Sequence, residues 1–310
     1  MAIAILIIIM CVIIFSLLIG NYFCNIALNP KVSKKYILRT FTEKDKEEEN
    51  KNKIDGEEWL KEFATEIEIL SEDDLKLHGY KVINPMKRSN TWVILAHGYM
   101  GKSCEMVQYA KKFIDFGYNT LLVDLRAHGK SEGKYIGMGW KDRKDIIKWI
   151  NELCEEEKDC QIILYGVSMG AATMMMTLGE SPAQNVKICI EDCGYTSVYR
   201  QFEMMLKVIK PYLAEYLMMC ANIVAKFKMG YNFTEASSIN QIKKSNIPIL
   251  FIHGDRDKFV PYEMLDELYE EANLPKEKLV IKNAGHVESS KINPELYWKT
   301  VKQFINRNLE

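Results

Sequence analysis

Short apolar segments alternate with helix-like segments along most of this chain. Two segments whose apolar and polar residues alternate, 64–70 and 75–83, precede six compact apolar runs of the kind that form buried strands. These runs are TWVILAH (91–97), YNTLLVD (118–124), QIILYG (161–166), VKICIED (186–192), IPILFIHG (247–254) and KLVIKN (278–283). Segments of helical periodicity separate most of them, at 105–116, 140–157, 169–178 and 261–272, and a last one covers 294–309. The alternation predicts an α/β fold with a mostly parallel, mixed sheet flanked by helices and two antiparallel strands at one edge.

A long segment between the strands at 186–192 and 247–254 interrupts this rhythm. Its middle, FEMMLKVIKPYLAEYLMMCANIVAKF, has helical spacing and is rich in methionine and aromatic residues. The residues alone leave two interpretations open. One is an ordinary packed pair of helices, and the other is a lid over an apolar substrate pocket, because methionine adapts to varied apolar shapes.

Residues 2–19 form an apolar run, AIAILIIIMCVIIFSLLI, in which Ser16 is the single polar residue. A helix rising ~1.5 Å per residue would cover roughly 27 Å here, about one hydrocarbon core. A buried core helix would show a polar face, and a signal peptide would show a basic start and a small-x-small cleavage site. Neither is present, and Phe23 before Cys24 fits a lipoprotein cleavage box poorly. The run predicts an uncleaved single-span anchor.

The flanks of this run predict its orientation. Lys31, Lys34, Lys35 and Arg39 follow it, whereas only the α-amino group precedes it. Positive residues tend to remain on the cytoplasmic side, so the body of the protein is predicted to be cytoplasmic. The eight cysteines show no disulfide framework and no zinc spacing, which favours a reducing compartment and buried free thiols such as Cys189 and Cys193.

Residues 42–55 (TEKDKEEENKNKID) are almost wholly charged or amide-bearing. Such a stretch buries little apolar area, and it predicts a solvated tether or a frayed helix start. Six acids against four lysines are too weak a bias for an acidic binding tail. The whole chain is nearly neutral, with 41 Lys+Arg against 42 Asp+Glu, which argues against nucleic-acid binding.

The sequence GVSMG (166–170) follows one predicted strand and opens a helix. A serine on a sharp strand-to-helix turn has a strained backbone, and its neighbours two residues away must lack bulk. The helix N-terminus directs its dipole toward the serine oxygen. We therefore predict that Ser168 is a nucleophile.

A serine hydroxyl needs a base, and the base needs a carboxylate that fixes its tautomer. His286 follows the last apolar strand, where a loop can bring it over the sheet edge. The preceding strand is followed by HGDRDKFVP (253–261), in which Asp257 is the predicted partner. Asp255, which we expect to bond to the turn, and Asp192, at an earlier strand end, remain alternatives.

The other histidines are assigned different roles. His78 is expected on an exposed hairpin, His253 as a satisfied buried group and His97 as structural. His128 precedes Ser168 in the chain, which is the wrong order for a base in this layout.

An oxyanion intermediate needs two N–H donors. One is predicted at Met169, directly after the nucleophile. The other is predicted at Tyr99, in the loop HGYMG (97–101), where glycines let the backbone approach closely.

Together these motifs resemble the α/β-hydrolase superfamily over residues 64–308. The order Ser168, Asp257, His286, each after its own strand, matches the nucleophile–acid–histidine order of that superfamily. The HGYMG loop, the DLRAHGKSEG segment, the GVSMG elbow and the HGDRDKFVP loop resemble the monoacylglycerol-lipase and serine-aminopeptidase-like branch, and membrane-anchored bacterial hydrolases of undefined substrate. Haloalkane dehalogenases are disfavoured, because those relatives carry aspartate at the position of Ser168.

The resemblance implies an α/β-hydrolase fold and a cap made of the insertion at about 198–245. We predict three parts: a transmembrane anchor (1–28), a charged tether (29–58) and a hydrolase domain (59–310). The predicted activity is a serine hydrolase that cleaves carboxylic esters with apolar acyl groups and needs no cofactor or metal. A serine peptidase, amidase or thioesterase of the same fold is the alternative. A non-catalytic binding protein is disfavoured by the complete set of catalytic residues.

Overall fold

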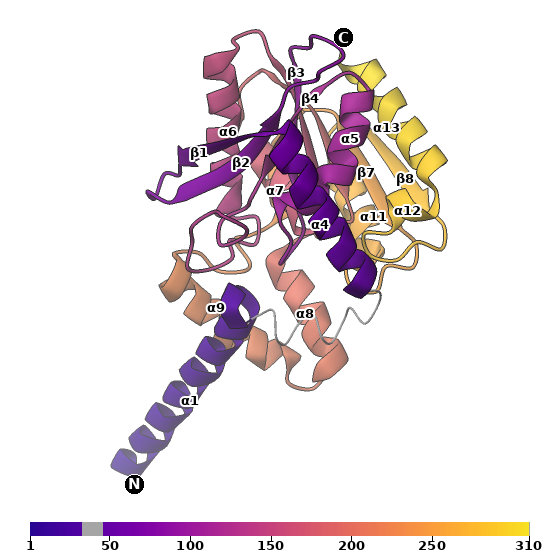
Figure 1. Ribbon diagram of the computed structural model, residues 1–310. Helices are drawn as coiled ribbons and strands as arrows, with labels where there is room; N and C mark the ends of the chain where they lie inside the picture. Colours follow the sequence, from indigo (N-terminus) through magenta and orange to yellow (C-terminus); the bar gives the residue numbers. More distant parts are fainter. Residues whose placement is uncertain (33–45, 310) are drawn as a thin grey trace.

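The centre of the protein is a mixed eight-stranded β-sheet with helices on both faces (Figure 1). The structure, a computed structural model, describes residues 1–32 and 46–309. The strands lie in the order β1-β2-β4-β3-β5-β6-β7-β8. At one edge β1 (Thr65–Leu70) and β2 (Lys76–Val82) are antiparallel, β2 is also antiparallel to β4, and the other neighbours are parallel. The predicted fold class is confirmed.

The remaining strands are short. They are β3 (Thr91–Ala96), β4 (Asn119–Val123), β5 (Gln161–Val167), β6 (Val186–Asp192), β7 (Ile249–Gly254) and β8 (Lys276–Ile281), the last of which forms the other edge of the sheet. Every side chain of β3, β4 and β7 is buried, as expected for strands that read as continuous apolar runs. Because the parallel strands end at the same edge, the loops that follow β3, β5, β7 and β8 meet there.

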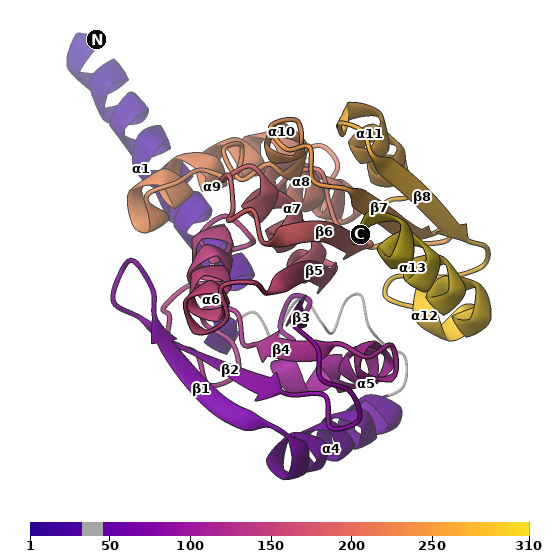
Figure 2. The ribbon, with the colours of Figure 1, turned by 90° about the horizontal axis from the view of Figure 1, so that it is seen from above.

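The helices form two layers, best seen from above (Figure 2). One layer holds α6 (Asp142–Glu156), α7 (Met169–Leu178), α10 (Ser238–Ile242) and α11 (Glu263–Glu271), whose apolar side chains share one core. The other holds α4 (Lys46–Phe63), α5 (Val107–Asp115) and α13 (Pro294–Asn308), which share a second core. Two short helical segments, η1 (Ser103–Met106) and α12 (Ser289–Ile292), precede α5 and α13.

The predicted tether at 29–58 differs from the structure in its second half. Residues from Lys46 onward belong to α4, while 33–45 lie outside the described residues. The end of α4 packs on the body: Leu60 is buried in the second core, and a Cβ on Gly56 would overlap the carbonyl of Cys104. Lysine and glutamate favour helix formation, but a short charged helix is not stable alone in water. The contact with the body supplies the remaining stabilisation of α4.

The N-terminal run forms one long helix, α1 (Ala2–Leu28), whose first part projects from the body (Figure 1). By length and composition α1 is the one helix in the described part of the chain that is able to cross a membrane. Its last turns also pack on the body. Gly20, Cys24, Ala27 and Leu28 are buried, and the last three of them join the first core.

The segment between β6 and β7 contains the helices α8 (Val198–Ile209) and α9 (Ala214–Met229), followed by α10. α8 starts at Ser197, whose side chain accepts a hydrogen bond from the N–H of Arg200, and α9 ends at Gly230 with a left-handed backbone (φ 76°). α9 packs against both α8 and α1. The two helices therefore lie between the sheet edge and the projecting helix α1.

Candidate active site

Ser168 lies on a sharp turn between β5 and α7. Its backbone has φ 56° and ψ −116°, a conformation that non-glycine residues rarely adopt. Glycines on either side make the turn sterically possible: a Cβ on Gly166 would overlap the carbonyl of Gly170, and one on Gly170 would overlap that of Ala96. The serine side chain is thereby held at the N-terminus of α7.

Ser168, His286 and Asp257 form a chain of hydrogen bonds. The Oγ of Ser168 lies 2.9 Å from Nε2 of His286, and Nδ1 of His286 lies 2.7 Å from Oδ2 of Asp257. The three side chains come from the loops after β5, β8 and β7, as the sequence predicts. Ser168 and Asp257 are buried, whereas the imidazole of His286 is partly exposed.

The environment of Asp257 keeps it ionised. Burial alone would raise the pKa of its carboxyl group, but hydrogen bonds from His253 and His286 hold the pKa well below the ordinary value. Its Oδ1 also accepts the backbone N–H groups of Phe259 (2.8 Å) and Val260 (2.9 Å). A fixed carboxylate of this kind orients the imidazole and stabilises its protonated form.

Asp255 and Asp192, the alternative carboxylates, have other partners. Asp255 accepts the backbone N–H of Asn283 at 2.6 Å, a turn contact as expected. Asp192 accepts the hydroxyl of Tyr297 at 2.9 Å, and burial raises its pKa to about 6. Neither carboxylate has a hydrogen bond to His286 among the described contacts.

His253 is a residue whose part in the site the sequence did not reveal. It is buried, with Nε2 2.9 Å from the carbonyl of Val260 and 3.3 Å from Oδ2 of Asp257. The same carboxylate therefore lies between two histidines. The sequence predicted a satisfied buried group but gave no signal that it faces Asp257.

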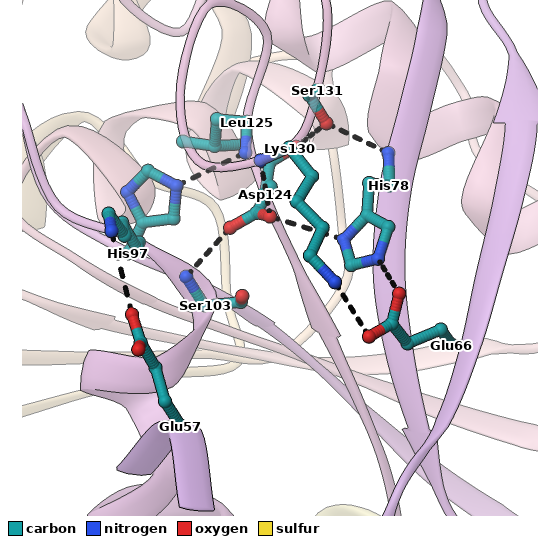
Figure 3. A network of polar contacts seen from close by, with 10 residues as sticks. Glu57, Glu66, His78, His97, Ser103, Asp124, Leu125, Lys130 and Ser131 are labelled. Atoms are coloured by element: carbon teal, nitrogen blue, oxygen red, sulfur yellow. Dashed lines mark hydrogen bonds and ion pairs between the residues drawn. The ribbon is translucent and has the colours of Figure 1, made fainter. Parts of the chain in front are cut away.

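The expectation that His78 lies on an exposed hairpin is wrong. Its side chain is buried, with Nδ1 3.2 Å from Oδ2 of Asp124 and Nε2 3.1 Å from Oε2 of Glu66 (Figure 3). β2 is covered because it lies inside the sheet edge and because the loop after β4 bonds to it, through the N–H of His78 and Oγ of Ser131.

Asp124, at the end of β4, connects this network to neighbouring loops. It accepts the backbone N–H groups of Ser103 (2.9 Å) and Lys130 (3.0 Å) as well as facing His78 (Figure 3). Burial would raise the pKa of Asp124, but these hydrogen bonds and the nearby His97 hold it well below the ordinary value. The ionised carboxylate thus fixes the loop after β4 next to the 97–101 loop.

Two histidines bind the 97–101 loop to the loop after β4. His97 accepts the N–H of Leu125 through Nε2 (3.1 Å), and His128 accepts the N–H of Met100 through Nε2 (3.2 Å). Burial lowers the pKa of His128 to about 3, so it remains neutral and can accept that bond at physiological pH. Both histidines therefore have structural contacts. This role was predicted for His97, whereas for His128 the sequence argued only against a role as the base.

The 97–101 loop lies beside the serine. A Cβ on Gly98 would lie 3.9 Å from Oγ of Ser168, so the backbone passes close to the nucleophile. Met169, the other predicted donor, is the first residue of α7. Tyr99 and Met169 also line the same small cavity next to Ser168.

This cavity is small and apolar. Its volume is about 20 Å³, close to that of one water molecule. Its walls come from the 97–101 loop, the elbow, the loop before α6, the loop after β6, α8 and the loop after β7, and the lining residues are Tyr99, Met138, Ser168, Met169, Tyr195, Gln201, Phe202, Met205 and Phe259. Phe202 and Met205 belong to α8, so movement of α8 is the direct way to enlarge the cavity.

One cluster with metal-ligand geometry occurs among the described residues, and it overlaps the hydrogen-bonded chain. Ligand atoms of Cys193, Asp257 and His286 lie within 4.8 Å of one another. Burial raises the pKa of the Cys193 thiol well above its ordinary value, so the sulfur stays protonated. Both nitrogens of His286 already face Ser168 and Asp257. The cluster therefore lacks the free, deprotonated ligands that a metal site requires.

Known proteins resemble this chain over most of its length. A family model described as serine aminopeptidase, S33, matches residues 87–214. The protein YqkD of Bacillus subtilis is 30% identical over 231 residues, covering 74% of this chain and 75% of YqkD. The chain belongs to the α/β-hydrolase superfamily.

Two further relatives are informative about this hydrolase. The esterase Pf2001 of Pyrococcus furiosus has a similar structure, with a TM-score of 0.65 and 27% identity over 82% of this chain and 96% of that one. The membrane protein YNL320W of Saccharomyces cerevisiae is 20% identical over 77% of this chain and 78% of its own length. The hydrolase is thus related to esterases as well as to the serine-aminopeptidase-like family.

Proposed function

We propose that this protein is a membrane-anchored serine hydrolase that cleaves carboxylic esters with apolar acyl groups. The observation that carries the proposal is the hydrogen-bonded chain Ser168–His286–Asp257 at the edge of an apolar cavity. Each member of the chain has the partner that its role in acyl transfer requires.

In the proposed reaction Oγ of Ser168 attacks the ester carbonyl carbon while Nε2 of His286 takes the hydroxyl proton. The negative charge that develops on the carbonyl oxygen is held by the N–H groups of Tyr99 and Met169. The C–O bond to the alcohol then breaks, and His286 returns the proton to the leaving oxygen. Water, deprotonated by His286, attacks the acyl carbon of the acyl-enzyme. The bond between that carbon and Oγ of Ser168 then breaks, His286 returns the proton to Oγ, and the carboxylic acid leaves. Asp257 stays ionised throughout and stabilises the imidazolium.

The walls of the cavity support an apolar acyl group. Phe202, Met205 and Phe259 surround the space next to Ser168, and none of the described residues that line it is charged. Such a space favours hydrocarbon over a charged substrate. The cavity is too small for an acyl chain as it stands, so the proposal includes movement of α8 within a cap formed by residues 198–245.

Labelling by a fluorophosphonate probe tests the nucleophile. The full-length protein, purified in detergent, is expected to be labelled, and the matched variant Ser168→Ala is expected to lose the label. The full chain is needed because α1 and α4 both pack on the body. Equal labelling of both proteins, or none of either at neutral pH, would contradict the proposed role of Ser168.

A peptidase, amidase or thioesterase activity is the second candidate, because the matching family model is described as serine aminopeptidase. A panel of p-nitrophenyl esters of increasing acyl length, matched aminoacyl p-nitroanilides and acyl thioesters distinguishes these activities. We expect the highest kcat/KM on an ester with a medium or long acyl chain. Faster turnover of an amide or a thioester would reverse the order.

We also propose that residues 1–28 anchor the chain in a membrane with the hydrolase domain, residues 59–310, on the cytoplasmic side. The length of α1 and the lysine that follows it, Lys31, support this placement. Lys34, Lys35 and Arg39, the other basic residues of the argument, lie outside the described residues. A topology reporter fused after residue 310 is expected to be active only inside the cell, and an external signal would overturn the orientation.

A further inference from the structure

Helix α9 packs against α1. A Cβ on Gly20 would overlap the carbonyl of Cys220, so the backbones of the two helices are in contact at this position. Near the start of α9, Oγ of Ser16 lies 2.6 Å from the hydroxyl of Tyr216. Near its end, Nζ of Lys228 donates to Oδ1 of Asn25 at 2.7 Å. These contacts fix the position of α9 along the axis of α1.

The outward face of α9 carries a row of exposed apolar residues. Met219, Ile223 and Phe227 follow one another at intervals of four residues, which places them on one side of the helix, and Phe227 is 84% exposed. The exposed Glu215 precedes them on the same side. The opposite side of α9, with Met218, Ala221 and Ala225, is buried in the first core. Three exposed apolar residues in a row, on a helix whose other side is already buried, are unusual in water.

The exposed apolar surface continues around the end of the neighbouring helix. Val208 and Ile209 at the end of α8, and Tyr212 and Leu213 in the turn before α9, are all at least half exposed, and Tyr212 is 99% exposed. This surface and the outer side of α9 form what is called here the cap face: Val208, Ile209, Tyr212, Leu213, Met219, Ile223 and Phe227.

The position of α1 identifies what covers the cap face. A groove of about 460 Å³ runs between the two helices, lined by Ile14, Leu17, Leu18 and Asn21 of α1 and by Val224, Phe227 and Lys228 of α9. Ile14, Leu17 and Leu18 belong to the apolar run that matches one hydrocarbon core. Phe227 shares the groove with them, so it lies at the depth of hydrocarbon or of its boundary whenever α1 crosses a bilayer.

We propose that the cap face is a second membrane-contact surface, embedded in the leaflet on the body side, with an acyl chain of a bilayer lipid seated in the groove between α1 and α9. Lys228 lies at the body-side end of the groove, where an ammonium group can reach the headgroups while its stem covers apolar surface. This inference rests on the proposal that α1 crosses a membrane.

Brominated lipids, which quench tryptophan fluorescence from within the hydrocarbon region, test the proposal. The full chain is reconstituted in phosphatidylcholine nanodiscs with or without bromine on the acyl chains. Single variants Ile223→Trp and Phe227→Trp add a reporter to the cap face, and the signal of the five native tryptophans is subtracted with the wild type. We expect both added signals to be quenched by bromine and protected from acrylamide, a water-soluble quencher.

Two further variants separate the possible failures. Phe15→Trp reports on α1 itself, where Phe15 is 61% exposed, and Met86→Trp reports on an exposed site (89%) in the loop between β2 and β3. Quenching at Phe15→Trp but acrylamide accessibility at Ile223→Trp and Phe227→Trp equal to that at Met86→Trp would overturn the cap-face proposal alone. Lack of bromine quenching at Phe15→Trp would overturn the anchor as well. A dimer in native mass spectrometry that protects both reporters from acrylamide and bromine alike would show that a second copy covers the cap face instead.

Discussion

Substitution of Gly20 tests how strongly the N-terminal helix α1 is packed into the hydrolase. Gly20 is the one glycine of α1, and its backbone packs against α9, where an added Cβ would overlap the carbonyl of Cys220 and lie 2.8 Å from Cγ2 of Val224. At an exposed helix position, replacing glycine by alanine stabilises by roughly 0.5–1 kcal/mol. Here we expect the opposite sign, because no space exists for the new atom.

The size of the destabilisation depends on how the interface between α1 and α9 accommodates the larger side chain. Local shifts around an overpacked side chain cost about 1–3 kcal/mol. If α1 instead leaves α9, Leu28 loses its burial, worth about 1.5–3 kcal/mol. Two hydrogen bonds of the last turn are lost as well: the hydroxyl of Tyr99 donates to the carbonyl of Ala27 (2.6 Å), and the N–H of Ile136 donates to that of Leu28 (2.8 Å). We therefore expect Gly20→Leu to destabilise the body by at least about 2 kcal/mol, a fall of roughly 4–8 °C in apparent Tm.

The assay is thermal unfolding of the full-length protein in detergent, followed by intrinsic fluorescence, with ester hydrolysis measured on the same samples. Ala4→Leu is the matched control, because it adds similar bulk to an exposed position of the same helix. We expect Gly20→Leu to lower both the apparent Tm and kcat/KM, and Ala4→Leu to change neither. An unchanged Tm in Gly20→Leu would refute the docking of α1 on α9.

Three other substitutions give distinct results. Asp257→Asn should lower kcat by about 10⁴-fold on a p-nitrophenyl ester, because an amide favours the wrong tautomer of His286, and a loss below tenfold would contradict the role of the carboxylate. Tyr99→Phe removes the hydrogen bond to the carbonyl of Ala27, worth about 1 kcal/mol. If the 97–101 loop positions an oxyanion donor, kcat on the same ester should fall by a larger factor than KM changes. Burial raises the pKa of Glu191 from 4.5 to about 8, so the folded state keeps a proton that the unfolded state has lost. Its contribution to stability is greatest below pH 4.5 and falls as the pH rises toward 8, by up to about 1.4 kcal/mol per pH unit. Glu191→Gln should therefore unfold at a higher temperature than the wild type at pH 8 and lose that advantage at pH 5, and an equal difference at both values would contradict this assignment.

The sheet and the candidate site were accessible from sequence because their signals are local. Each buried strand is a short apolar run, and each of the residues Ser168, Asp257 and His286 follows its own strand within a few positions. Parallel strands bring their ends to one edge, so strand order along the chain is enough to predict which loops meet. The steric requirement for Gly166 is likewise contained within five residues, because a Cβ there would overlap the carbonyl of Gly170.

Other features depend on contacts between distant segments, which a single sequence does not reveal. His78 reads as an exposed hairpin residue, yet the loop after β4 covers it through Ser131 and Asp124. The charged start of α4 resembles a tether. The end of α4 belongs to the body because Leu60 is buried in the second core. In both cases tertiary packing overrides a local pattern.

The apolar run of α1 is the most instructive of these cases, because its composition predicts a membrane helix and says nothing about its last turns. Phe23 meets Phe202 edge to face with ring centroids 6.0 Å apart, and Ala27 receives the hydroxyl of Tyr99. Phe202 and Tyr99 both line the cavity beside Ser168. Helix α1 therefore supports two walls of the space in which we propose that the acyl group binds. Removing α1 would expose the core residues that Leu28 covers and would remove the contacts to Phe202 and Tyr99. The position of α1 and the shape of the cavity are consequently coupled through one set of contacts.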